Sequence, residues 1–117
     1  GLGLPIAVGR AIAEPNRDVY CLISDGECAE GSIWESLSYI NEQNITNIKV
    51  YVNINGTAAY KKINVLYLAN RLQTFLPSIN LRYTTVEHFP FLRGLNAHYH
   101  IMRDEDYQQG KELLENR

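Results

Sequence analysis

An acidic turn and an amide turn each follow a short apolar run in this sequence. Asp25 comes two positions after the run 19–23, and Asn55 comes three positions after the run 48–52. Runs of this kind that end in Asp-Gly or Asn-Gly are typical of buried strands followed by tight turns. A carboxylate and an amide oxygen are ligands that Mg²⁺ prefers, with waters and substrate phosphates completing its octahedron. The two turns therefore indicate a metal site that also holds a phosphate-bearing ligand.

The residues next to these turns suit a diphosphate group. Gly26 has no side chain, so the backbone at this position can approach a phosphate closely. The helix expected to begin near Glu30 points its amino end in the same direction, and the amide groups of such an end attract anions. After Asn55, the chain can turn a backbone carbonyl such as that of Thr57 toward the metal. These parts together describe a diphosphate that a metal ion bridges to the protein.

The two turns can share one ligand only if their strands are neighbours. Residues 30–42, between the two apolar runs, have the spacing of apolar side chains that is typical of a helix. A strand, a helix and a second strand within roughly 30 residues form a β-α-β unit with parallel strands. In open parallel sheets, ligands bind beyond the carboxyl ends of the strands. We therefore expect Asp25 and Asn55 on neighbouring strand ends at one edge of the sheet.

Three segments, in matching order and spacing, resemble one known family. Residues 25–35 resemble the thiamine diphosphate motif of transketolases, in their amino-terminal cofactor-binding domain. Residues 53–57 resemble the paired-asparagine turn that follows this motif, and residues 3–9 resemble the Gly-Leu-Pro-x-Ala-x-Gly stretch that precedes it. The resemblance is close over about the first 60 residues and thin afterwards. It implies a truncated thiamine diphosphate-binding fold of the α/β class, with a mostly parallel sheet and helices on both faces.

The resemblance implies a set of metal ligands. Asp25 matches the metal-binding aspartate, Asn55 the metal-binding asparagine, and Thr57 the residue whose backbone carbonyl completes the protein ligands. The family has Asn or Asp directly before the metal asparagine, whereas this sequence has Ile54 there and Asn53 one position earlier. Asn53 therefore stays an alternative ligand, although the spacing from Asp25 favours Asn55. The metal is expected to be Mg²⁺ or Ca²⁺.

The resemblance also implies roles for a glycine and three glutamates. Gly26 matches the glycine whose amide contacts the diphosphate, and Glu27 belongs to the same cofactor-binding segment. Glu30 and Glu35 match two acidic residues that approach the subunit interface in transketolases and communicate with the cofactors of both sites. They are the expected catalytic residues. Taken without the resemblance, they are the solvated face of a helix, which is the usual position of glutamate.

The implied function is that of an enzyme subunit. It binds thiamine diphosphate through Mg²⁺ and contributes to two-carbon ketol transfer between sugar phosphates. Transketolases are much longer, so a pyrimidine-binding domain on another chain must complete the site, and a homodimer is expected. Two alternatives remain open. One is a reduced, non-catalytic binding module of the same fold. The other is a subunit of another thiamine diphosphate enzyme, of the 2-oxoacid dehydrogenase or deoxyxylulose phosphate synthase type.

Length and composition limit the class of protein. At 117 residues with 45% hydrophobic and 21% charged residues, the chain reads as one soluble globular domain over 1–117. A net charge of −2 argues against nucleic-acid binding, which requires a basic surface. No apolar run reaches the roughly 20 residues that span a membrane. Cys21 and Cys28 form no CxxC pair, and reduced thiols favour a cytoplasmic setting.

The remaining elements follow from periodicity, prolines and a capping residue. Pro15 should end the first helix, Pro90 should keep its neighbours irregular, and Asp104 should cap the last helix. His98 and His100 would share one face of a final strand, which makes them a weak candidate for a metal pair. In chain order, the expected helices are 1–14, 58–75 and 105–115, and the expected strands are 81–86 and 97–102.

Overall fold

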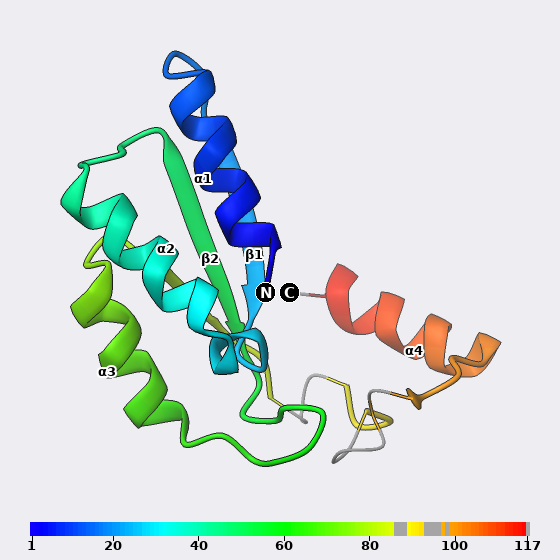
Figure 1. The fold of residues 1–117 in the computed structure, drawn as a ribbon. Coiled ribbons are helices and arrows are strands. Elements are labelled where there is room, and N and C mark those ends of the chain that lie inside the picture. Colours follow the sequence, from blue (N-terminus) through cyan, green and yellow to red (C-terminus); the bar gives the residue numbers. More distant parts are fainter. Residues whose placement is uncertain (86–88, 93–96, 98, 117) are drawn as a thin grey trace.

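The computed structural model of the chain describes residues 1–85, 89–92, 97 and 99–116. Three strands and the helices between them form the body of the molecule, and a last helix follows at the carboxyl end (Figure 1). The elements are α1 (Gly3–Ala13), β1 (Val19–Ser24), the 3₁₀ turn η1 (Glu27–Ala29), α2 (Gly31–Glu42), β2 (Ile48–Ile54), α3 (Val65–Phe75), β3 (Asn80–Tyr83) and α4 (Asp104–Glu115).

The three strands form one parallel sheet in the order β1-β2-β3. Two β-α-β units therefore follow one another, with α2 as the first crossover and α3 as the second. The last residue of β1, Ser24, pairs with Asn53 near the end of β2. This register brings the carboxyl ends of the two strands to the same edge of the sheet. The predicted α/β class with a parallel sheet is confirmed.

One face of the sheet carries the hydrophobic core. Alternate residues of the strands, among them Ile23 and Val52, are buried in a single cluster with apolar residues of α1, α2 and α3. On the other face of β1, Tyr20 is 67% exposed and Leu22 is 72% exposed. In the described part of the chain, α1, α2 and α3 thus lie on one face, whereas the sequence indicated helices on both. Right-handed crossovers that step in the same direction place their helices on the same face.

The side chain of Asn47, directly before β2, bonds to the end of α1 and to the loop that follows it. The Asn47 amide donates hydrogen bonds to the carbonyls of Ala11, Glu14 and Arg17, at 3.0, 3.2 and 3.0 Å. These carbonyls stand at and beyond the end of α1, where helical partners run out. Pro15 follows directly after, as expected for a helix that stops. The loop between α1 and β1 is therefore fixed at the amino ends of the strands.

The helix expected over 58–75 begins later, at Val65. Asn64 caps α3, since its side-chain oxygen accepts from the backbone N–H of Tyr67 at 3.1 Å. The residues before it form a loop that folds back on itself, and Thr57 makes an isolated antiparallel bridge with Lys62. The loop lies beside the turn that follows β1, because a Cβ added to Gly26 would lie 3.6 Å from Ala58.

The expected strand over 97–102 is wrong. Ala97 and Tyr99 have 3₁₀ geometry, and the N–H of His100 bonds to the carbonyl of Ala97 at 3.3 Å, so the backbone bonds locally instead of joining a ladder. His98 lies outside the described residues, and the expected strand 81–86 ends at Tyr83 within them.

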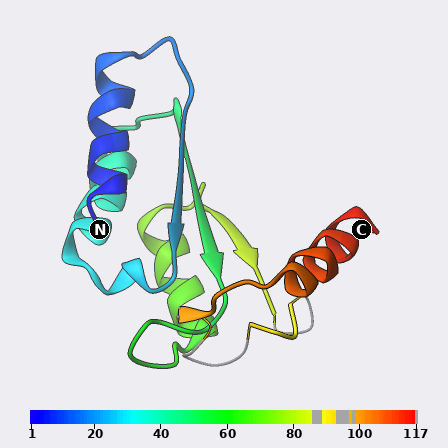
Figure 2. The ribbon, with the colours of Figure 1, turned by 90° about the vertical axis from the view of Figure 1, so that its right-hand side faces the viewer.

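The predicted cap of the last helix is also wrong. Arg103, not Asp104, precedes α4, and its N–H donates to the carboxylate of Asp106 at 3.0 Å. Asp104 is instead the first residue inside the helix. Figures 1 and 2 show α4 set apart from the sheet.

Candidate functional site

The carboxylate of Asp25 is enclosed by the turn that follows β2. Its Oδ2 atom accepts from the backbone N–H of Asn55 at 2.9 Å and from that of Gly56 at 2.7 Å. The N–H of Asp25 itself continues the β1–β2 ladder by donating to the carbonyl of Asn53 at 3.0 Å. Asp25 is 3% exposed. The structure therefore brings the acidic turn and the amide turn together, as the parallel sheet predicted.

The second carboxylate oxygen of Asp25 is buried without a partner. Oδ1 makes no hydrogen bond among the residues that the structure describes. A buried carboxylate oxygen that lacks a donor carries a large desolvation penalty, and proteins satisfy such atoms with a cation or a donor. Oxygen is also the ligand type that Mg²⁺ and Ca²⁺ require. The residues present therefore fit a hard metal ion at Oδ1.

The turn after β2 presents a second oxygen at the same edge. The side-chain oxygen of Asn55 accepts from the N–H of Thr57 at 2.8 Å, which leaves one lone pair of the amide oxygen for another ligand. The side-chain oxygen of Asn53 instead accepts from Thr84 Oγ1 at 2.6 Å, on the β3 side. Of the two asparagines, Asn55 is the one whose turn encloses Asp25.

Gly56 belongs to this arrangement, although the sequence analysis gave it no role. Its φ is +79°, in the left-handed region where side chains are strained, and its N–H makes the shorter of the two bonds to Asp25. The Asn55-Gly56 dipeptide was the available signal, because Asn-Gly marks a turn that needs positive φ. The backbone at this point is thus shaped by Gly56 and held by Asp25.

Glu27 closes the turn at the end of β1. Its carboxylate Oε2 accepts from the backbone N–H of Ser24 at 2.9 Å and from Ser24 Oγ at 3.3 Å. In return, Ser24 Oγ accepts from the N–H of Glu27 at 3.2 Å. Ser24 therefore contributes a hydroxyl to the turn. Glu27 positions the backbone around Gly26.

Burial keeps the thiol of Cys28 protonated, and the acidic turn adds to this effect. Burial, followed by the charges of Asp25 and Glu27, raises the pKa of Cys28 to about 12, and the charge of Arg71 opposes this only in part. A thiol with such a pKa is a poor nucleophile and a poor metal ligand at neutral pH. Cys28 therefore packs in the core beneath the site.

Two pockets adjoin Asp25 and Gly26. The smaller, of about 260 Å³, is also lined by the predicted residues Glu27, Glu30, Asn55 and Thr57. The larger, of about 550 Å³, extends toward Trp34 and α3. No group of three or more His, Cys, Asp or Glu side chains suited to a metal occurs among the described residues. A metal here would instead combine one carboxylate with amide and carbonyl oxygens.

The model of one protein family covers most of the chain. The model for the thiamine pyrophosphate enzyme, C-terminal TPP binding domain, matches residues 1–109. The chain belongs to this family. The cofactor of the family is thus the expected one, since thiamine pyrophosphate and thiamine diphosphate are the same molecule. One expectation is corrected: the sequence analysis took the domain to be amino-terminal, whereas the family is described as C-terminal. The motif itself carries no information about where it stands in a longer chain.

The names of three curated relatives are consistent with a family of thiamine pyrophosphate-dependent enzymes. A transketolase-like protein 2 of Mus musculus is 34% identical over 85 residues, which cover 64% of this chain and 13% of that protein. A transketolase of Pongo abelii is 37% identical over 60 residues, 47% of this chain and 10% of that protein. A 1-deoxy-D-xylulose-5-phosphate synthase of Fusobacterium nucleatum is 40% identical over 55 residues, 47% of this chain and 9% of that protein.

The chain therefore spans about a tenth of the length of these relatives. No solved structure matches it at a significant level. Within the described residues, no helix combines the length and the apolar character that crossing a membrane requires.

Two of the predicted site residues of this TPP-binding domain lie at its surface. Glu30 directly precedes α2, and its side chain makes no capping bond to the helix. Glu35 lies five residues further along and is also exposed, but it does not line either pocket beside Asp25. The structure therefore leaves both carboxylates accessible from outside the chain.

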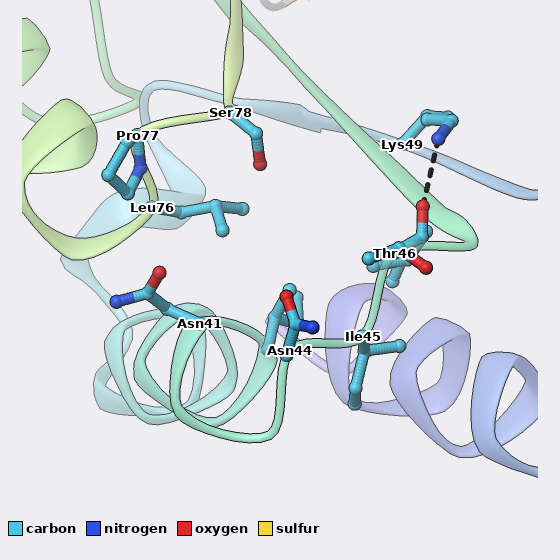
Figure 3. A pocket seen from close by; sticks show the side chains of 10 residues that line it. Asn41, Asn44, Ile45, Thr46, Lys49, Leu76, Pro77 and Ser78 are labelled. Atoms are coloured by element: carbon cyan, nitrogen blue, oxygen red, sulfur yellow. Dashed lines mark hydrogen bonds between the residues drawn. The ribbon is translucent and has the colours of Figure 1, made fainter.

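A third pocket, of about 330 Å³, lies at the opposite edge of the sheet (Figure 3). It is lined mainly by amides, hydroxyls and apolar side chains around the start of β2 and the residues before β3. Its one charged lining residue, Lys49, donates to the carbonyl of Thr46 at 2.9 Å. The imidazole of His100 lies outside all three pockets and instead bonds to Asp106 at 2.9 Å.

Proposed function

We propose that the chain binds thiamine diphosphate through Mg²⁺ at the edge formed by Asp25 and Asn55. In this proposal it contributes to two-carbon ketol transfer between sugar phosphates, once a pyrimidine-binding domain of another chain completes the site. The observation that carries the proposal is the buried Oδ1 atom of Asp25, which has no donor among the described residues while Oδ2 has two. In the proposal, a divalent cation is the partner of this atom.

The proposed ligands come from two loops. Asp25 Oδ1, the side-chain oxygen of Asn55 and the backbone carbonyl of Thr57 would hold the metal. The N–H of Gly26 would bind the diphosphate. A Cβ added to Gly26 would meet Ala58 at 3.6 Å, which is an ordinary contact, so the packing of the chain does not itself require glycine there. The absence of a side chain at Gly26 therefore leaves room for a ligand.

The chain's own contribution is binding and orientation. When bound, thiamine diphosphate supplies the electron sink for breaking and forming a carbon–carbon bond. Asp25 fixes the turn that carries Asn55, and Glu27 fixes the turn that carries Gly26. Since both turns end strands of one sheet, the metal and the diphosphate would be held on a rigid support.

The exposure of Glu30 and Glu35 is consistent with the partner chain that the proposal requires. Glu30 and Glu35 are accessible at the amino half of α2, where a second subunit could meet them. A homodimer or a pyrimidine-binding chain would bury them and bring their carboxylates toward the cofactor. Cys21 and Cys28, both buried free thiols, are consistent with the reducing, cytoplasmic setting that we propose.

Calorimetry tests the cofactor site. Titrating the chain with thiamine diphosphate should give saturable heat with Mg²⁺ present and none after chelation. Asp25→Asn should abolish this Mg²⁺-dependent binding, whereas Asp18→Asn, at an exposed acid seven residues earlier, should preserve it. Equal binding by the two variants would show that Asp25 does not hold the metal.

A second candidate reaction has a specific observation in its favour. The 40% identical relative is a 1-deoxy-D-xylulose-5-phosphate synthase, and its match is as long a share of this chain as that of the Pongo abelii transketolase. Assays of both reactions, with the chain alone and with added pyrimidine-domain chains, separate the two candidates. Cofactor binding with neither activity would instead support a non-catalytic module.

A further inference from the structure

The larger pocket beside Asp25 has basic walls. It is built from η1, α2, the loop after β2 and α3, and it shares Asp25 and Gly26 with the smaller pocket. The charged side chains that line the smaller pocket are all carboxylates, whereas three cations line the larger one. These cations are Lys61, Lys62 and Arg71. Acidic and basic surroundings therefore meet at the Asp25-Gly26 turn.

The guanidinium group of Arg71 is held in place by aromatic stacking. Its Cζ atom lies 4.1 Å from the ring centroid of Trp34 and 5.5 Å from that of Tyr67. Trp34 is itself fixed, because its Nε1–H donates to the carbonyl of Cys28 at 2.9 Å and its ring meets Phe75 edge-on with centroids 5.1 Å apart. Stacking uses the flat face of a guanidinium and leaves the N–H donors at its edge for an anion.

None of the three cations has an acidic partner in the described part of the chain. Lys61, Lys62 and Arg71 are absent from its ion pairs and side-chain hydrogen bonds, although the chain as a whole has a net charge of −2. Like charges that face one cavity repel each other, so an anion in the cavity would be stabilised. Among the described residues, the lysine and arginine side chains that do pair with carboxylates are Arg10, Arg17, Arg103 and Lys111.

We propose that this pocket binds the phosphate group of an anionic ligand that reaches the Asp25 edge. Arg71 would bind two phosphate oxygens in a fixed orientation, and Lys61 and Lys62 would act as mobile point charges at the rim. The volume of about 550 Å³ is larger than a phosphate needs, so the organic part of a phosphate ester would also fit. This binding depends on neither Mg²⁺ nor the cofactor.

The single tryptophan of the chain provides a direct readout. Inorganic phosphate, titrated without Mg²⁺ or cofactor, should change Trp34 fluorescence saturably, because the anion would bind the Arg71 guanidinium group that stacks on Trp34. Arg71→Gln should weaken phosphate binding at least about tenfold, the size expected for loss of a charge-assisted bond. Calorimetry should accompany the fluorescence, because this substitution also changes the surroundings of Trp34. Arg82→Gln is the matched control, since Arg82 lies over an aromatic ring, Tyr51, at 5.7 Å but outside the pocket.

Two results would overturn the proposal. One is the absence of saturable phosphate binding by the wild-type chain. The other is equal affinity of the wild type and the double variant Lys61→Gln/Lys62→Gln, whose substitutions lie in an exposed loop and keep the test valid if Arg71→Gln fails to fold. Because these titrations contain no Mg²⁺, they can fail while Mg²⁺-dependent cofactor binding succeeds, and the reverse also holds.

Competition identifies the source of the phosphate group. Thiamine diphosphate with Mg²⁺ should displace inorganic phosphate if the pocket holds the cofactor's own terminal phosphate. Ribose 5-phosphate should instead bind to the cofactor-loaded chain, with the same loss in Arg71→Gln, if the pocket holds a substrate phosphate. Either result supports a phosphate subsite.

Discussion

Two side chains hold the loops at opposite ends of the sheet, and they do so differently. At the amino ends of the strands, the Asn47 amide donates to three carbonyls, and Lys49 nearby donates to a fourth. At the carboxyl ends, one oxygen of Asp25 accepts from two backbone amides, and the other is buried without a donor among the residues that the structure describes. Both ends have a pocket of several hundred Å³. The size of a pocket therefore does not distinguish the two ends, whereas the unsatisfied buried carboxylate oxygen does.

Removing the carboxylate of Asp25 should have the largest effect. Asp25→Ala leaves the amides of Asn55 and Gly56 without an acceptor, so we expect the free energy of unfolding to fall by about 2–4 kcal/mol. Mg²⁺-dependent binding of thiamine diphosphate should be lost as well. Urea unfolding and calorimetry measure the two effects. If Asp25→Ala bound the cofactor as the wild type does, the carboxyl ends of the strands would have no more role in cofactor binding than the amino ends.

Removing the amide of Asn47 should affect stability only. Asn47→Ala deprives three carbonyls of a donor, which should lower the free energy of unfolding by about 2 kcal/mol. Because the amino ends of the strands lie away from Asp25, affinity for Mg²⁺ with thiamine diphosphate should stay within about twofold of the wild type, measured at a temperature where the variant is folded. A large loss of affinity in this folded variant would show that the amino ends of the strands also contribute to cofactor binding.

The two glycines of the carboxyl end should separate folding from binding. Gly56→Ala forces a side chain into a backbone with φ of +79°, and its Cβ would lie 3.3 Å from Val65, so a loss of about 1 kcal/mol is expected. Gly26→Ala meets only ordinary contacts and should leave the free energy of unfolding unchanged, yet weaken cofactor binding. Thermal unfolding and calorimetry of both variants test this. Unchanged cofactor binding by Gly26→Ala would show that the diphosphate does not bind at Gly26.

The meeting of Asp25 with Asn55 could be predicted because it depends on local patterns and one general rule. Apolar runs that end in turns locate β1 and β2, and parallel strands bring their carboxyl ends to one edge. The start of α3 could not be placed, since Lys61, Lys62 and Ile63 fit neither a clear helix nor a clear loop. The cap at Asn64 decides it, and that hydrogen bond is visible only in the structure.

Tertiary contacts account for what the sequence did not reveal. The stack of Arg71 on Trp34 joins two helices that lie far apart in the chain. Residues 97–102 have strand composition, but a strand exists only where another strand offers a ladder, and none pairs with the described residues of this segment. The open face of β1 also depends on the direction of the crossovers, which apolar periodicity does not encode.

The smallest predicted effect comes from a second buried acid, Asp106, which contrasts with Asp25. Asp106 is 7% exposed, and its Oδ2 atom bonds to both the N–H of Arg103 and the imidazole of His100. The bond from the Arg103 backbone, followed by His100, holds the pKa of Asp106 below its ordinary value of 3.8. A carboxylate with a lowered pKa stabilises the folded state at pH above that ordinary value, and this stabilisation is lost as the pH falls through the folded pKa.

We therefore expect the carboxyl-terminal helix α4 to loosen below about pH 4. Faster amide hydrogen exchange in α4 than in β2, measured between pH 6 and pH 3 and corrected for the intrinsic pH dependence, would show this. Asp106→Asn should remove the pH dependence, whereas Asp104→Asn, at the exposed first residue of the same helix, should retain it. If α4 and β2 lost protection together at each pH, the bonds of Asp106 would not be the acid-sensitive interaction.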